Sequence, residues 1–285
     1  MLSVLLGVCG MFGWGIYDFL GGVLAKRIGS FAPLFWSQVA GAATIVLAAI
    51  AIRASIGFSM QSLLLAPVAA VLYCGGYLLF FKGFEKGNVS VIAATMNIWA
   101  VVTMAVAFLF MGQRLTAAQT IGAFTIIAGA TLASIDWTKV REQGFQLSLG
   151  VRETLLGALF FGVYWNVSEI LSEDVGWLTT TVLIKLGIVV ILLVFSMLTR
   201  QARQTLDGSS RITFVLVAMG VIEVCAVAAV NYGLAIGEAI LVSPIASALS
   251  VVTIVLALVF LREKISALQG LGMAMAVAGI ITTAL

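Results

Sequence analysis

The chain has 285 residues, of which 62% are hydrophobic and only 9% are charged, and its net charge is +3. Soluble domains carry about 25% charged residues, so this composition excludes a soluble enzyme and a disordered protein. The small net charge, with no basic cluster, also gives no indication of nucleic-acid binding. We therefore expect the chain to lie in a lipid bilayer.

Long apolar segments follow one another along the whole chain. A helix that crosses a bilayer needs about 20 apolar residues, and hydrocarbon offers backbone groups no water as a hydrogen-bond partner. The sequence therefore predicts an all-α polytopic membrane protein with ten transmembrane helices. We expect these spans at residues 2–24, 31–52, 62–81, 89–111, 116–135, 152–171, 177–199, 211–235, 239–261 and 266–285.

The two halves of the chain resemble each other. Residues 82–135 align without a gap with residues 232–285, which lie 150 positions later, and the two segments share glycines, a glutamine and a Val-Val-Thr sequence. The longest connection between predicted spans lies between the halves. We therefore divide the chain into a first five-helix repeat at 1–135, a connecting loop at 136–151 and a second five-helix repeat at 152–285.

An odd number of spans in each half has a consequence for the fold. The second half then enters the membrane from the opposite side, so the two repeats are inverted with respect to each other. Inverted repeats of this kind are a transporter architecture, in which two similar halves close around a site near the bilayer midplane.

Three stretches of sequence follow a recognisable pattern. They are GWGIYDFLGGVLAKR at 13–27, NVSVIAATMNIWAVVTMAVAFLFMGQRLTAAQTIGAFTIIAGATL at 88–132 and AILVSPIASALSVVTIVLALVFLREKISALQGLGMAMAVAGIIT at 239–282. These stretches resemble the EamA branch of the drug/metabolite transporter superfamily. Arg262-Glu263-Lys264 matches the family's typical hairpin, whereas the first half has Gln113-Arg114 there, without the acidic residue.

The resemblance implies alternating access to a cavity between the halves. It is specific for the fold and not for the substrate, because relatives carry amino acids, sugars conjugated to nucleotides, quaternary amines and drugs. It also implies that both termini lie in the cytoplasm. Most lysines and arginines follow the odd-numbered spans, however, and the positive-inside rule then places both termini outside. In either orientation we expect a multi-pass protein of the prokaryotic plasma (inner) membrane.

The predicted spans include the charged side chains Asp18, Glu169, Lys185 and Glu223. A charge at a helix centre costs at least about 2.5–3.5 kcal/mol on insertion scales, so such groups usually mark function. In one interpretation, Lys185 pairs with an acidic neighbour and holds two helices together. In the other, Glu223 is the partner of a substrate cation or the group that carries a coupling proton, and Lys185 holds a substrate carboxylate.

Aromatic and other polar side chains accompany these charges at helical spacing. Trp and Tyr faces beside a carboxylate bind an ammonium group through cation–π attraction, although such rings also anchor helices at the membrane interface. Besides the four ionisable groups, the predicted substrate-binding residues are Trp14, Tyr17, Tyr73, Tyr77, Asn97, Trp99, Tyr164, Trp165 and Ser247.

Enzymatic chemistry is not indicated by the residues present. The chain has no histidine, and its three cysteines, Cys9, Cys74 and Cys225, are far apart. Metal-ligand spacing, a nucleophile–histidine pair and a phosphate-binding loop are therefore all missing from the sequence. We expect no enzymatic activity, no cofactor and no metal.

The function expected from these features is secondary-active or facilitative transport of a small polar metabolite that bears an amine, such as an amino acid or a choline-like amine. Alternatives with the same fold are a multidrug or organic-cation exporter and a nucleoside or sugar exporter. A membrane enzyme and a photoreceptor with its chromophore on Lys185 are alternatives of other classes. The expected partners are the substrate, the bilayer and a coupling proton, while the direction of flux and a homodimer are left open.

Overall fold

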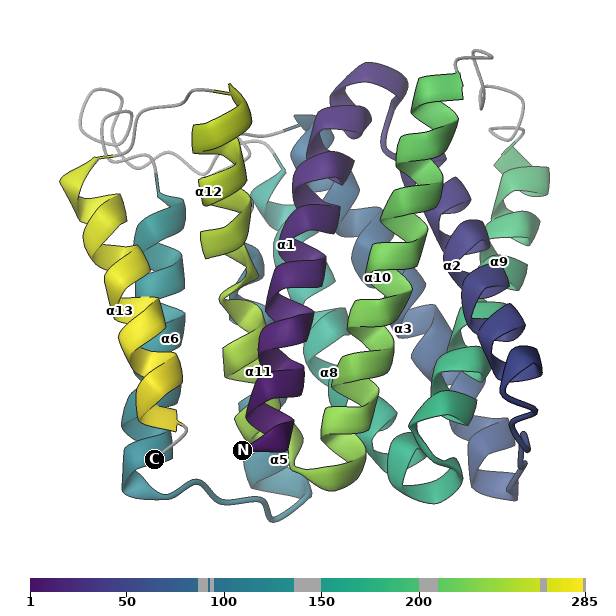
Figure 1. Cartoon of the computed structure of the whole chain (residues 1–285), viewed down its shortest axis with the longest axis horizontal. Coiled ribbons are helices and arrows are strands. Elements are labelled where there is room, and N and C mark those ends of the chain that lie inside the picture. The colour runs from purple at the N-terminus through teal and green to yellow at the C-terminus, as the bar shows by residue number, and fades with distance from the viewer. Residues whose placement is uncertain (87–91, 93–94, 136–149, 200–209, 262–265, 284–285) are drawn as a thin grey trace.

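The computed structural model describes residues 1–86, 92, 95–135, 150–199, 210–261 and 266–283. Within these residues every regular element is a helix, and the helices lie side by side in one bundle (Figure 1). The helices are α1 (Leu2–Ile28), α2 (Phe31–Ala51), α3 (Met60–Lys86), α5 (Ile98–Phe110), α6 (Ala117–Ser134), α8 (Val151–Val175), α9 (Trp177–Thr199), α10 (Ser210–Ile236), α11 (Ala239–Ser247), α12 (Leu249–Leu261) and α13 (Ala267–Thr283).

Seven helical segments of the described chain are long and apolar enough to cross a membrane, counting α11 and α12 together. Three of the ten predicted spans instead contain shorter apolar helices, namely α5, α6 and α13. The start of the fourth predicted span lies partly outside the described residues, as do most of the predicted loop 136–151 and the Arg262-Glu263-Lys264 hairpin.

The predicted span 239–261 is not a continuous helix. Helix α11 ends at Ser247, and α12 begins at Leu249. Pro244 lies inside α11 and cannot donate a backbone hydrogen bond. The Ser247 hydroxyl donates to the Pro244 carbonyl at 2.7 Å, which gives that carbonyl a partner near the end of the helix. This irregular backbone is tolerated because it is buried within the protein.

Glycine turns end the first helix of each half. Gly29 follows α1 with a φ angle of 81°, and Gly176 follows α8 with a φ angle of 80°. This backbone conformation is readily available only to glycine. The chain therefore turns sharply at both points, into α2 and into α9.

Capping boxes start the last helix of each half. The Thr116 side chain accepts from the Gln119 backbone N–H, and the Gln119 side chain accepts from the Thr116 backbone N–H. Ser266 and Gln269 exchange the same two hydrogen bonds, at 3.2 and 2.9 Å. Each box gives partners to N–H groups that a helix start otherwise leaves unpaired. The shared glutamine of the two aligned segments is therefore explained by the same local structure.

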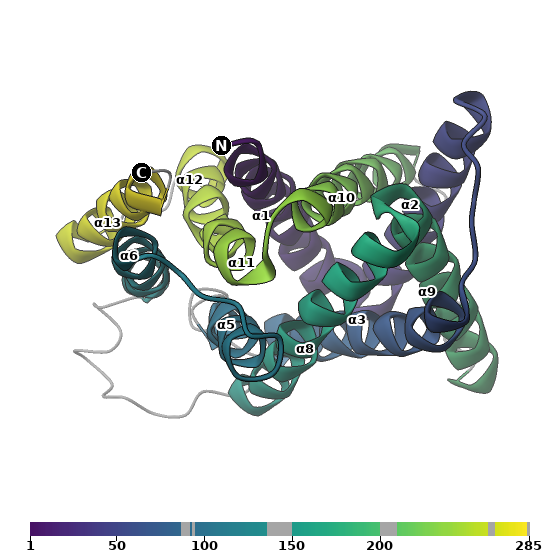
Figure 2. The same cartoon turned by 90° about the horizontal axis from the view of Figure 1, so that it is seen from below.

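The helices pack mostly across the two halves of the chain. α1 lies against α10, α3 against α8 and against α9, α2 against α10, and α6 against α13. Seen along the bundle, α6 and α13 form one end and α2 and α9 lie toward the other (Figure 2). The N- and C-termini lie at the same face of the bundle (Figure 1).

α1 and α3 end and α8 begins at the face opposite the termini (Figure 1), and charged side chains of these helices contact one another there. Glu85 accepts hydrogen bonds from Ser30 at 2.6 Å and from Lys82 at 2.9 Å, and Lys86 forms an ion pair with Glu153 at 2.5 Å. These ion pairs are exposed, so the cluster marks a water-facing end of the bundle rather than its core. Exposed ion pairs contribute little stability.

Glycines allow α6 and α13 to approach closely. A Cβ atom on Gly129 would lie 2.5 Å from the backbone nitrogen of Ala276 and 2.7 Å from the carbonyl oxygen of Gly272. A Cβ atom on Gly272 would in turn lie 2.5 Å from the backbone nitrogen of Ala133. Small residues at such a crossing let two membrane helices make extensive backbone contact.

We expect Gly129→Ala to lower stability by about 1–3 kcal/mol, because the added methyl group would overlap the backbone of α13. Thermal unfolding of the detergent-solubilised protein measures the effect. Gly22→Ala is the matched control, since a Cβ atom there would have no neighbour within 4 Å. Equal melting temperatures of the two variants would contradict the close α6–α13 contact as the cause of the loss.

Candidate functional site

A small pocket lies among α1, α3, α5, α8 and the start of α12. Aromatic rings line most of it, and it contains one carboxyl group, that of Asp18. Its cavity volume is about 30 Å³, which is room for one or two water molecules. The lining residues are Trp14, Asp18, Tyr73, Tyr77, Phe80, Met96, Trp99, Phe161, Trp165 and Leu249.

The tryptophans of the pocket come from both halves of the chain and lie against one another. The ring centroids of Trp14 and Trp165 are 5.0 Å apart, and those of Trp99 and Trp165 are 6.1 Å apart. Tyr73 and Tyr77 pack on the α3 side with ring centroids 5.0 Å apart and planes tilted by 59°. The result is a nearly continuous aromatic wall whose ring faces can attract a cation.

Two polar groups of α1 face this region without a partner. Asp18 is 4% exposed and Trp14 is 3% exposed, and they lie one helical turn apart. In the described part of the chain, neither the Asp18 Oδ1 atom nor the Trp14 indole N–H has a hydrogen-bond partner. Buried polar groups without partners are costly, so this pair fits a site that a ligand or water completes.

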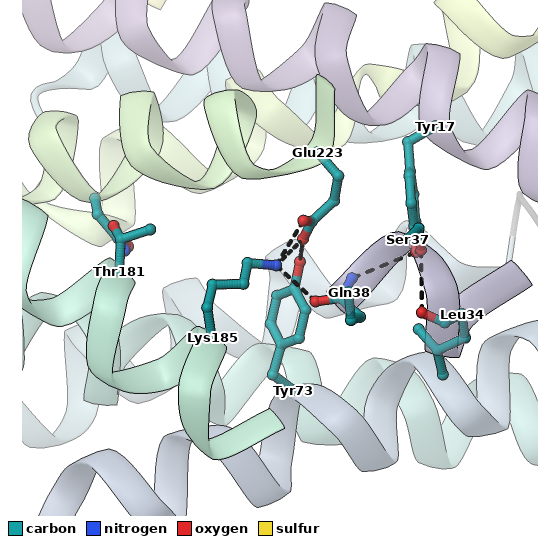
Figure 3. Close-up of polar contacts among 9 residues, drawn as sticks. Tyr17, Leu34, Ser37, Gln38, Tyr73, Thr181, Lys185 and Glu223 are labelled. Carbon is teal, nitrogen blue, oxygen red and sulfur yellow. Dashed lines mark hydrogen bonds and ion pairs between the residues drawn. The ribbon is translucent and has the colours of Figure 1, made fainter. Parts of the chain in front are cut away.

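A buried ion pair lies beside the pocket. The Lys185 ammonium donates to both carboxylate oxygens of Glu223 at 2.5 Å, and to Gln38 Oε1 at 2.7 Å. The Tyr73 hydroxyl also donates to Glu223, and the Lys185 ammonium lies 4.8 Å from the centre of the Tyr73 ring. Figure 3 shows these side chains converging from α2, α3, α9 and α10.

This network continues into α1 and joins the two halves of the chain. The Gln38 amide nitrogen donates to the Tyr17 hydroxyl at 3.4 Å, and Tyr17 shares a hydrogen bond of 3.0 Å with Ser37 (Figure 3). Tyr17, Gln38 and Tyr73 belong to the first half, whereas Lys185 and Glu223 belong to the second. Each strongly polar group of the network therefore has a partner supplied by another helix.

Glu169 lies in a separate cluster, at the start of α11. The Gln113 amide nitrogen donates to both carboxylate oxygens of Glu169 at 2.8 Å, and the Ala239 backbone N–H donates to one of them at 3.0 Å. The Gln113 side-chain oxygen accepts from the Ile240 backbone N–H at 3.1 Å. Glu169 and Gln113 thus satisfy N–H groups that begin α11, where negative charge is favoured by the helix dipole.

The remaining predicted residues are buried around the pocket, the Lys185–Glu223 network and the Glu169 cluster. Tyr164 packs against Tyr73 with ring centroids 4.8 Å apart. The Asn97 amide donates to Ser250 at 3.3 Å, and Ser247 donates to the carbonyl of its own helix. The Asn97 bond thus joins the start of α5 to α12, whereas the Ser247 bond is local to α11.

The structure brings six of the predicted residues to the pocket and places the others outside its lining. The six are Trp14, Asp18, Tyr73, Tyr77, Trp99 and Trp165. Those outside the lining are Tyr17, Asn97, Tyr164, Glu169, Lys185, Glu223 and Ser247. A role of any of them in substrate binding stays a prediction.

The sequence interpretation missed several residues of these clusters. Phe161 lies one turn before Trp165, and Phe80 lies one turn after Tyr77, so extending the helical spacing would have found both. Gln38 and Gln113 were missed as partners of buried charges. A lone glutamine inside the apolar run 31–52 was the available signal for Gln38.

A family model, the EamA-like transporter family, matches the chain twice, over residues 1–135 and 149–285. The chain belongs to the EamA-like transporter family. The family prediction is confirmed, and this EamA member is a multi-pass membrane transporter whose partners are the bilayer and a small-molecule substrate. Transport, not catalysis, is the activity that characterises the family.

Two further similarities accompany the family match. An uncharacterized protein of Methanocaldococcus jannaschii, MJ1333.1, is 29% identical over 136 residues, which are 47% of this chain and 96% of the relative. A protein of known crystal structure superposes on 98% of this chain and 94% of its own, with a TM-score of 0.78 and 17% identity. The second similarity shows a shared fold alone.

We expect the buried pair of this EamA member to be strongly coupled in stability. Lys185→Met or Glu223→Gln alone leaves a buried polar partner unmatched, and each should cost about 3–5 kcal/mol. The double variant should lose less stability than the sum of the two single-variant losses, because neither charge then remains. Thermal unfolding measures the cycle, with Lys82→Met as a control at the exposed Lys82–Glu85 pair. Additive losses would contradict the coupling.

Proposed function

We propose that this EamA transporter carries a small organic cation, such as a choline-like amine, through the aromatic pocket by alternating access. The observation that carries the proposal is Asp18, a buried side chain with an unpaired oxygen and the single carboxyl group among the lining residues of the pocket. An ammonium group placed there would gain an ion pair with Asp18 and cation–π contacts with the Trp14, Trp99 and Trp165 rings.

The charge of the lining favours a monocation over an amino acid. A substrate carboxylate would need a cationic partner, and the ten lining residues include none. Lys185 lies outside the lining and already donates to Glu223 and Gln38. A chromophore linked to Lys185 is disfavoured by the same contacts. A nucleoside or sugar would require several hydrogen-bonding groups, whereas the wall is mostly apolar and aromatic.

Paired contacts support an inverted arrangement of the two halves. The α1–α10 contact is repeated by α3–α8, as expected if α1 corresponds to α8 and α3 to α10. Gly122 lies against Gly279, and Gly129 lies against Gly272. A shift of 150 residues relates Gly122 to Gly272 and Gly129 to Gly279, so each contact is the counterpart of the other. MJ1333.1, which is matched over almost all of its length by about half of this chain, would correspond to one such repeat.

The size of the pocket supports movement of these halves during transport. A cavity of about 30 Å³ is too small for a choline-sized ligand, so the lining helices must separate when cargo enters. Rocking of one repeat against the other would provide that separation, first at one face of the bundle and then at the other.

We expect Asp18→Asn to reduce uptake of choline or a related amine into proteoliposomes by at least about tenfold, since the amide keeps the shape of the side chain and removes its charge. The same variant should lose the increase in melting temperature that the amine produces in the wild-type protein. Glu85→Gln, which removes an exposed carboxylate, is the matched control.

Full uptake by the Asp18→Asn variant would contradict the proposed role of Asp18. Stabilisation of the wild-type protein by amino acids, sugars or nucleosides, without any response to organic cations, would contradict the proposed substrate class.

A further inference from the structure

The first helices of the two halves make corresponding contacts, which show how their residues pair. A Cβ atom added to Gly15 of α1 would lie 2.5 Å from the Val252 side chain of α12. A Cβ atom added to Gly162 of α8 would lie 2.4 Å from the Val102 side chain of α5. The two glycines are 147 positions apart, as are the turn glycines that follow α1 and α8, and the two valines are 150 positions apart.

Helices α3 and α10 correspond in the same way, with a shift of 150 positions. Both bounds of α10 lie 150 positions after those of α3. A Cβ atom added to Gly21 would lie 2.6 Å from the Phe81 ring, so α1 meets α3 there. The counterparts of these two residues, Ser168 and Asn231, are joined by a hydrogen bond of 2.8 Å between α8 and α10.

These correspondences divide the lining of the pocket into two parts. Six of the ten lining residues form counterpart pairs of which both members line the pocket: Trp14 with Phe161, Asp18 with Trp165 and Trp99 with Leu249. The other four have counterparts that lie outside the lining. They are Tyr73, Tyr77, Phe80 and Met96, and their counterparts are Glu223, Val227, Val230 and Ala246. The pocket is therefore shared by both halves at its centre and belongs to one half at its edge.

The edge of the pocket lies toward the face opposite the termini. Helix α3 runs toward that face, whereas α10 runs toward the face that carries the termini (Figure 1). We define the α3 wall as Tyr73, Tyr77 and Phe80, and the α10 wall as Glu223, Val227 and Val230. From the centre, the two walls thus extend toward opposite faces of the bundle.

Inverted repeats exchange their conformations when a transporter turns from one face of the membrane to the other. A surface that α3 supplies in one arrangement is then supplied by α10 in the other. We propose that the α3 wall receives the cargo from the face opposite the termini, and that the α10 wall is a second binding surface for the same organic cation from the termini face. For the walls this inference rests on the proposed alternating access, and for the cargo it rests on the proposed function.

The two walls differ in their chemistry. Tyr77 and Phe80 present aromatic rings, whereas their counterparts Val227 and Val230 are aliphatic. The Glu223 carboxylate of the α10 wall is already paired within the second half of the chain. Cation–π attraction is therefore supplied by the α3 wall and not by the α10 wall. The cation should bind more tightly from the face opposite the termini.

The test labels single cysteines from one face of the membrane at a time and needs no cargo. Tyr77→Cys and Val227→Cys report the two walls, and Trp14→Cys reports the centre, each in a protein whose three native cysteines are replaced by alanine. An anionic methanethiosulfonate, which does not cross the bilayer, is added to right-side-out or inverted membrane vesicles. Arg27→Cys and Ser55→Cys, exposed at the end of α1 and before α3, identify the two faces.

We expect the reagent to modify Tyr77→Cys at least about tenfold faster from the face marked by Arg27 than from the face marked by Ser55. Val227→Cys should show the reverse preference. Trp14→Cys should be modified from both faces, because the centre of the pocket serves both arrangements.

Two further sets of variants control the labelling. Phe80→Cys and Val230→Cys are a second counterpart pair, which replaces the first if one of its variants does not fold. Ile126→Cys is the negative control, because Ile126 is fully buried in the contact between α6 and α13 and should react from neither face.

The proposal is overturned if the cysteines of the two walls react from the same face, or if each reacts equally from both. It is also overturned if neither reacts from either face, because neither wall then becomes accessible to water.

The cargo is tested separately, with choline. Tyr77→Val gives the α3 wall the residue of its counterpart, so the KM for choline that enters from the face opposite the termini should rise by about threefold or more. The KM from the termini face should stay unchanged in this variant and should fall in Val227→Tyr. Equal changes at both faces would count against a wall that acts on one side. A protein that carries no choline contradicts the proposed function and leaves the labelling result unaffected.

Discussion

Compensation of buried charge is the constraint on which the interior of this bundle depends. An isolated charge in an apolar interior is so unfavourable that it must be paired or neutralised. The described chain has four fully or nearly fully buried aspartate, glutamate or lysine side chains, of which three are acids and one is a base. Lys185 and Glu223 neutralise each other through contacts as short as 2.5 Å. Two acids therefore remain for which the described residues supply no cation.

The two remaining acids are placed in different surroundings. Asp18 faces a pocket of tryptophan and tyrosine rings and leaves one oxygen unpaired, which suits a ligand that arrives and departs. Glu169 accepts hydrogen bonds from a neutral amide and from the N–H groups that begin α11, where negative charge is favoured. One acid thus faces the pocket, and the other joins Gln113 of the first half of the chain to the start of α11. The Lys185–Glu223 pair keeps its own charge balanced while it connects helices of both halves.

Much of the helical plan followed from the sequence, because long apolar runs and their breaks depend on local chemistry. The glycine that follows α1, the capping box of Thr116 and Gln119, and the interruption after Pro244 also depend on nearby residues. They were not predicted, and the span 239–261 was expected as one continuous helix. Burial of the four ionisable side chains was also expected, since each lies within an apolar run. The three shorter helices differ from the prediction, which counted apolar residues and not the length of regular helix.

The partners of the buried charges could not be predicted in the same way. Which acid meets Lys185 depends on how α9 packs against α10, and periodicity along a single helix carries no information about its neighbours. The sequence therefore left two interpretations of Lys185 and Glu223 open. Glu169 was grouped with Trp165 by spacing, yet it lies beyond the pocket because α11 begins beside it.

The account's central claim is that a cation occupies the aromatic pocket between the two halves, and the most direct test is an experimental structure determined with choline bound. The account predicts an enlarged pocket, with the ammonium group beside the Asp18 carboxylate and within about 6 Å of the Trp14, Trp99 or Trp165 ring centres. An ammonium group bound to Glu223 after displacement of Lys185, or bound outside the space between the halves, would contradict it.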